Sequence, residues 1–195
     1  LCLFLCGQIN AQYTYDVSSS INNGNPGGTT FAETATTGFT NVGIAGTIST
    51  NVWSSVQTIP FPFNFYGGNV NGFKVSANGL LTFKKSVTGT PPNANGSLPN
   101  ASLPDSTIAV FWDEFTNLPP TGSNDLVYTF VTGATPNRQL WIYWFSFEYG
   151  NPAVTFQYNA AVLEETSNNI YIVDVYGDAA ASLLSSTVGV QLNST

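Results

Sequence analysis

Short runs of β-branched and aromatic residues, separated by clusters of Gly, Pro, Asn and Ser, recur every 10–18 residues from about Ile59 onward. This spacing is typical of strands joined by short turns. Helical periodicity is nearly absent, and "DAAASLLSS" at 178–186 is the single helix candidate. Parallel sheets need crossover helices. The pattern therefore predicts an all-β protein with little or no helix, an antiparallel two-sheet β-sandwich that is jelly-roll-like.

The stretch "FPFNFYGGNVNGFKVSANGLLTF" at 61–83 shows how strands and turns alternate. Because successive side chains in a strand point to opposite faces, the three phenylalanines of "FPFNF" share one buried face. Apolar runs on both sides of Asn78-Gly79 predict a hairpin, in a turn that needs two residues tolerant of positive φ. We expect these rings to be core, with only Tyr66, at the Gly67-Gly68 turn, displayed.

The run "LWIYWFSFEY" at 140–149 predicts a strand with two apolar faces. Strict alternation gives one wholly aromatic face and a second face that turns polar toward its end. The aromatic face would consist of Trp141, Tyr143, Phe145, Phe147 and Tyr149, and the other of Leu140, Ile142, Trp144, Ser146 and Glu148.

Charge is scarce in this chain of 195 residues: 11 acids and four bases give a net charge of −7, and only 8% of residues are charged. A nucleic-acid-binding protein carries a basic stripe, and none is present. An anionic membrane surface is disfavoured for the same reason. Hydrophobic residues make up 43% and aromatic residues 14%, which indicates a folded domain with a sizeable core.

The first eleven residues, "LCLFLCGQINA", have the pattern of the end of a signal peptide, with cleavage after Ala11. Two alternatives are lipidation at Cys6 and an apolar strand that belongs to the fold. We expect residues 12–195 to form a single β-sandwich domain, best defined over 57–192, at the N-terminus of a longer protein. Both cysteines lie in the leader, so the mature domain would have no disulfide.

Catalytic chemistry has little support. Without histidine or a cysteine in the mature domain, the usual nucleophile–base arrangements cannot be built. Paired carboxylates are the remaining route, as in glycoside hydrolysis. However, Asp113 and Glu114 are neighbours in a predicted strand and would point to opposite faces. The sequence predicts a protein that is not an enzyme.

Two kinds of binding site can be suggested from residue type. No cofactor is expected, but calcium takes oxygen ligands from loops, and the candidate ligands are Asp105, Asp113, Asp125 and Asp178. Exposed aromatic rings could stack on sugars. The candidates near strand ends or on the less uniform face are Trp53, Tyr66, Trp144 and Tyr149. Surface acids and core rings are the alternative interpretation of both sets.

The order of segments resembles a known group of domains. "IPFPFNFYGG", "FKVSANGLLTF", "STIAVFWDEF", "VTFQYNAAVLEE" and "VGVQL" follow one another over about residues 57–192. This order resembles the nidogen-like extracellular domain and the N-terminal surface domains of bacterial proteins exported by the type IX secretion route. The resemblance implies an extracellular β-sandwich module without known catalysis, and it carries no functional residues that can be transferred.

These observations favour a non-catalytic module of a secreted or cell-surface bacterial protein, used for adhesion or structural assembly. Its partners would be an extracellular glycan, a protein surface or other copies of itself. One alternative is a carbohydrate-binding module of a secreted hydrolase. Another is a fibre subunit in which the apolar N-terminal segment completes a neighbour's sheet by strand addition.

Overall fold

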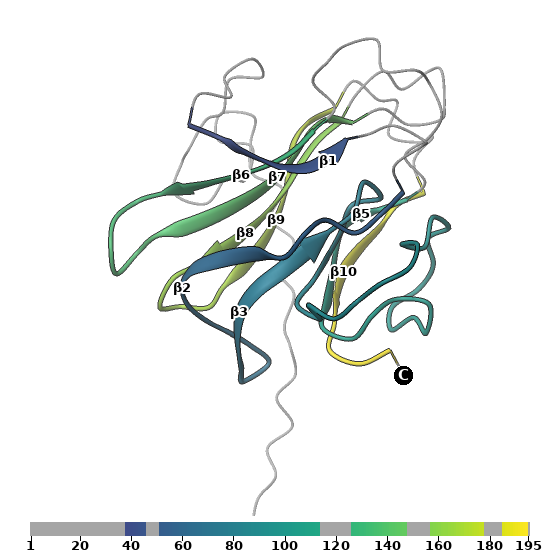
Figure 1. Cartoon of the computed structure of the whole chain (residues 1–195), viewed down its shortest axis with the longest axis horizontal. Helices are drawn as coiled ribbons and strands as arrows, with labels where there is room; N and C mark the ends of the chain where they lie inside the picture. Colours follow the sequence, from purple (N-terminus) through teal and green to yellow (C-terminus); the bar gives the residue numbers. More distant parts are fainter. Residues whose placement is uncertain (1–37, 46–50, 114–125, 148–156, 178–184, 195) are drawn as a thin grey trace, which may run out of the picture.

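A computed structural model of the chain describes residues 38–45, 51–113, 126–147, 157–177 and 185–194. In these residues the chain forms ten strands in two five-stranded antiparallel sheets that pack face to face (Figure 1). The described part contains no helix, and hence none that could cross a membrane. The predicted all-β sandwich is confirmed. Most of the helix candidate at 178–186 lies outside the described residues.

The two sheets have the orders β1-β6-β7-β8-β9 and β10-β5-β4-β3-β2. The first consists of β1 (Thr40–Ala45), β6 (Leu126–Thr132), β7 (Gln139–Phe147), β8 (Gln157–Glu164) and β9 (Ile170–Gly177). The second consists of β2 (Gln57–Phe65), β3 (Gly68–Val75), β4 (Leu80–Thr82), β5 (Thr107–Trp112) and β10 (Thr187–Gln191).

Each sheet is built mainly from strands that follow one another in the chain. Strands β2 to β5 form one meander and β6 to β9 the other, rather than the Greek-key crossings of a jelly roll. The first and last strands each join the sheet formed by the other half of the chain: β1 pairs with β6, and β10 pairs with β5. Each sheet is therefore completed by a strand from the other half of the chain, which ties the two halves together.

The main core lies between the sheets and draws buried residues from both. Strand β2 shows why its sequence folds this way: Phe61, Phe63 and Phe65 are buried, and the residues between them are exposed. The predicted alternation is confirmed. Pro60 and Pro62 fall on the exposed positions of this edge strand, where a missing N–H is tolerated.

The Asn78-Gly79 pair forms the predicted hairpin but not in the predicted turn. Ser76 N–H donates to Leu80 O, so the loop has three residues, and of Asn78 and Gly79 only Gly79 has a positive φ, at 70°. A three-residue loop that ends in a left-handed residue is a common alternative to the two-residue turn. Gly79 is required there, because an added Cβ would lie 2.2 Å from Phe111 O.

Strand β7 departs from strict alternation near its end. The ladder with β8 shifts between Trp144 and Phe147, and Ser146 has a φ of 61°. Phe147 therefore joins Trp144 in the core between the sheets, instead of sharing a face with Phe145. A β-bulge inserts one residue and reverses the later side chains, so the prediction for Phe147 was wrong.

A second apolar cluster covers the other face of the first sheet. Trp141, Tyr143 and Phe145 are at most 3% exposed, so the aromatic face of β7 is buried. Phe39, just before β1, stacks on Phe130 of β6 with ring centroids 4.1 Å apart. Both faces of β7 therefore contribute to packing, which agrees with its nearly continuous apolar sequence.

A third cluster covers the outer face of the second sheet. Leu80, Ala109 and Trp112 pack there against Leu103 and Leu98 of the segment between β4 and β5. Trp112 Nε1 donates to Pro92 O over 3.0 Å, which fastens this segment to β5. The segment is thereby held beside β10, where it forms one wall of the candidate site.

Candidate functional site

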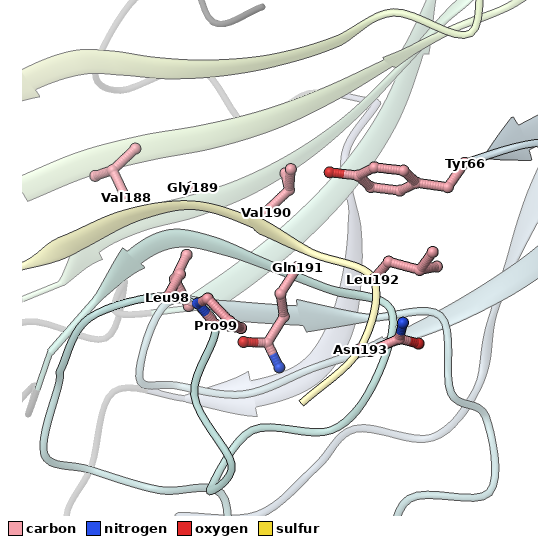
Figure 2. A pocket seen from close by; sticks show the side chains of 9 residues that line it. All are labelled: Tyr66, Leu98, Pro99, Val188, Gly189, Val190, Gln191, Leu192 and Asn193. Atoms are coloured by element: carbon pink, nitrogen blue, oxygen red, sulfur yellow. The ribbon is translucent and has the colours of Figure 1, made fainter. Parts of the chain in front are cut away.

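A hollow of about 420 Å³ opens along β10, between the turn that joins β2 to β3 and the segment before β5 (Figure 2). This volume is within the range of small-ligand sites. Figure 2 shows Tyr66, Val188 and Val190 on one side of β10, and Gln191 beside Leu98 and Pro99 on the other. The full lining is Tyr66, Leu98, Pro99, Val188, Gly189, Val190, Gln191, Leu192 and Asn193.

Tyr66 is displayed by a two-residue hairpin turn. Phe65 pairs with Gly68, so Tyr66 and Gly67 are the two turn residues, with φ of 48° and 80°. Two positive φ values define the turn type that suits the right-handed twist of a hairpin, and Asn or Gly is usual at its first position. The prediction placed this turn at Gly67-Gly68, one residue too late.

The ring of Tyr66 packs against Phe65 and is half exposed to solvent. Phe65 lies edge-on to it, with centroids 4.8 Å apart and an interplanar angle of 81°. Tyr66 nevertheless remains 49% exposed. The expected display of this residue is confirmed, and the ring forms a firm apolar wall of the hollow.

The floor of the hollow is apolar because of β10 itself. Val188 is 52% exposed and Leu192 39% exposed, although both are large apolar residues. In the part of the chain that the structure describes, β10 is the edge strand of its sheet, so no further strand lies beside Val188.

The opposite wall is fixed to β10 by a buried amide. Gln191 Oε1 accepts from Asn100 N–H at 2.9 Å, while its Nε2 donates to Asn100 O at 3.3 Å and to Pro104 O at 3.1 Å. Thr187 Oγ1 also donates to Gly96 O at 2.9 Å. Leu98 and Pro99 lie between these attachments, so the wall is held at both ends.

The lining carries no carboxylate, ammonium or guanidinium group. The charge nearest along the chain belongs to Asp105, whose Oδ1 accepts from Ser194 N–H at 3.0 Å. The N–H of Ser194, then its hydroxyl, and finally Lys84 hold the pKa of Asp105 below its usual value, against the opposing effect of burial. This carboxylate is an attachment point for the end of β10. The hollow itself can bind through a ring face, apolar side chains and the Asn193 amide.

The other predicted stacking residues are less available. Trp144 is 1% exposed in the core, so the expectation that it is displayed was wrong. Trp53 is partly buried and packs against the cluster that contains Trp112. Tyr149 lies outside the described residues. Of the three predicted rings that are described, Tyr66 alone lines the hollow.

The two predicted calcium ligands that the structure describes, Asp105 and Asp113, do not lie close together. Asp105 precedes β5 and Asp113 follows it, which places them roughly 25 Å apart along an extended strand. Ser185 and Ser186 donate to Asp113 Oδ2 at 3.1 and 3.3 Å. Asp125 and Asp178 lie outside the described residues, and those that are described include no cluster of three acids, histidines or cysteines.

The sequence did not point to most residues of the hollow. Leu98 and Pro99 lie about 90 residues before β10 in the chain, and the hydrogen bonds of Gln191 and Thr187 hold their segment against it. One signal was present in the sequence: the apolar residues Val188, Val190 and Leu192 of "VGVQL" alternate, which predicts that they share one face of the strand.

Comparison with known proteins places this architecture in a family. The model of the NIDO-related family matches residues 24–195, nearly the whole chain and further toward the N-terminus than the resemblance noted from the motifs. No curated protein and no solved structure matches the chain. The nidogen-like resemblance is confirmed. The chain belongs to the NIDO-related family.

Proposed function

We propose that this domain is a non-catalytic extracellular module that serves adhesion or structural assembly within a larger secreted bacterial protein. The observation that carries the proposal is the hollow beside Tyr66, an uncharged and open surface with a half-exposed ring. Its walls are a tight turn and a segment fastened by hydrogen bonds. A surface held in this way can bind a partner without a large change of shape.

Two described acids, Glu164 and Glu165, support a role without catalysis, whereas burial raises the pKa of Asp174. Glu165 accepts two hydrogen bonds from the Arg138 side chain, at 2.6 and 2.8 Å, and these bonds lower its pKa. Burial raises the pKa of Glu164, but hydrogen bonds led by that of Ser167 outweigh it and the pKa is lowered. Both carboxylates stay ionised and bonded within turns, whereas a catalytic pair needs one protonated acid.

The extracellular setting is part of the proposal. It is supported by the apolar segment at residues 1–11, by the low share of charged residues, and by membership of the NIDO-related family. Export by the type IX route, suggested by the order of motifs, belongs to the same proposal.

Two measurements test the proposed function: where the protein is located, and whether it turns over a substrate. Antibody against the 195-residue chain is expected to label intact source cells or to detect the protein in the medium. The purified chain is expected to bind an extracellular surface and to leave polysaccharide, ester and peptide substrates unchanged. Cytosolic antigen would contradict the proposal. So would turnover that disappears in Glu165→Gln or Asp113→Asn.

A further inference from the structure

We propose that the hollow beside Tyr66 takes a neutral glycan, with one sugar ring stacked on the Tyr66 ring and its hydroxyl groups directed to the polar rim. This inference rests on the proposed binding function and names the chemical class of its partner. Three independent features of the hollow carry it: the backbone conformation of Tyr66, the exposure of the apolar lining, and the lack of charge.

The first feature is a tyrosine in a conformation that disfavours it. A positive φ is uncommon for residues other than glycine, and it is least suited to bulky side chains. In the described residues the other non-glycine positions with positive φ are all polar: Ser106, Ser146, Thr166 and Asn168. Tyr66 is the one aromatic residue among them. Asn at position 66 would fit the turn better. Strained positions of this kind gather at ligand-binding sites, where the side chain is retained for what it contacts.

The second feature is the exposed apolar surface next to the ring. Val188, Leu192 and Tyr66 are three of the six large apolar residues that are exposed in the described part of the chain, and all three line this one hollow. A sugar ring offers an apolar face of C–H groups and a polar edge. A flat ring beside aliphatic side chains matches that face.

The third feature concerns charge. A chain with a net charge of −7 repels anionic ligands, while the hollow has no carboxylate that would attract a cationic peptide. Uncharged donors and acceptors remain at its rim, in the exposed amide of Asn193. This combination matches an uncharged ligand that has both an apolar face and many hydroxyl groups. Sulfated and uronic-acid glycans do not match it.

Binding to neutral oligosaccharides tests the inference. The full chain would be applied to an array of glucan, mannan, galactan and xylan fragments, with sulfated and uronic-acid fragments and a proline-rich peptide as comparators. Binding to at least one neutral fragment is expected. Tyr66→Phe should retain it, and Tyr66→Asn should weaken it about tenfold, the effect of losing one ring contact.

Two controls separate binding from stability. Tyr66→Asn should leave the melting temperature unchanged or raise it, because Asn suits the turn. Val188→Asn should weaken binding, whereas Val131→Asn, at a site of similar exposure on β6, should not.

No binding to any neutral fragment, preference for the anionic fragments or the peptide, or binding that Tyr66→Asn leaves intact would overturn the inference. So would a melting temperature for Tyr66→Asn that falls as far as that of a core variant, since the ring would then be structural. Surface adhesion that persists in Tyr66→Asn would overturn the glycan site while leaving the proposed function in place.

Discussion

The indole Nε1 of Trp144 donates a hydrogen bond of 2.9 Å to the main-chain oxygen of Ser76. Trp144 lies on β7 of one sheet, and Ser76 follows β3 of the other, so this bond joins the two layers through the core. A buried carbonyl that loses its partner costs free energy. The orientation of the two sheets is therefore fixed by a polar contact as well as by apolar packing.

Trp144→Phe should lower the free energy of unfolding by about 2–4 kcal/mol, because it removes this bond and leaves a cavity. Denaturant unfolding would measure the change. Trp53→Phe, at a partly exposed site, serves as the control and should cost clearly less. Equal losses at the two positions would show that the bond to Ser76 contributes nothing.

Gly79→Ala should lower the free energy of unfolding by about 3 kcal/mol or more, because a strained φ and a steric clash act together. The new Cβ would meet Phe111 O at 2.2 Å, where the chain of β5 approaches the turn. Thermal melting would show this as a loss of roughly 6–12 °C for a domain of this size.

Gly89 provides a control for that prediction. Its φ of 82° is similar, but an added Cβ would meet nothing within 4 Å. Gly89→Ala should therefore cost only the conformational strain, about 1–2 kcal/mol. If the two variants melt at the same temperature, close approach of Phe111 to Gly79 is not what requires glycine.

Gln191→Leu should loosen the wall formed by Leu98 and Pro99. The substitution leaves Asn100 N–H and two carbonyl groups without their partner, at a cost of about 1–3 kcal/mol. Oligosaccharide binding should weaken as well, because the wall is no longer fixed to β10. Gln57→Leu serves as the control. The Gln57 amide donates to Ser55 O and Oγ, two residues away in the chain, so this variant should change neither stability nor binding appreciably.

Acid should destabilise the domain through its bonded carboxylates. Hydrogen bonds from Arg138 hold the folded-state pKa of Glu165 below its ordinary value of 4.5. A lowered pKa contributes stability above the unfolded value, and this stability is lost as the pH falls through the folded value. The melting temperature should therefore fall as the pH drops below about 4.5. Glu165→Gln should lower it at pH 7 and hardly at all at pH 3. An equal loss at both values would contradict an ionic origin.

The local pattern predicted the strands well where one face alone meets the core. In β2 the exposed residues Pro60, Pro62 and Asn64 alternate with buried phenylalanines, so the period of two could be seen directly. Strand β7 was harder, because both of its faces are buried. A bulge at Ser146 then exchanged the faces, and no residue type at that position signals it.

The candidate site could be predicted only in part. Tyr66 stood out because a ring next to two glycines indicates a displayed turn. The wall of the hollow opposite Tyr66 is assembled by contacts between residues about 90 positions apart, such as Asn100 and Gln191. Such pairings depend on which strand joins which sheet, and a single sequence does not encode that order as a local pattern. Trp144 was misjudged for a related reason, since its buried indole finds a partner on the opposite sheet.

The most direct measurement of the central claim is a titration of the isotope-labelled chain with neutral oligosaccharides, followed by NMR of the backbone amides. The account predicts that chemical shifts change for Tyr66, Leu98 and the residues of β10 that line the hollow, and stay constant for β6 and β7. An absence of changes, or changes centred on the other sheet, would contradict it.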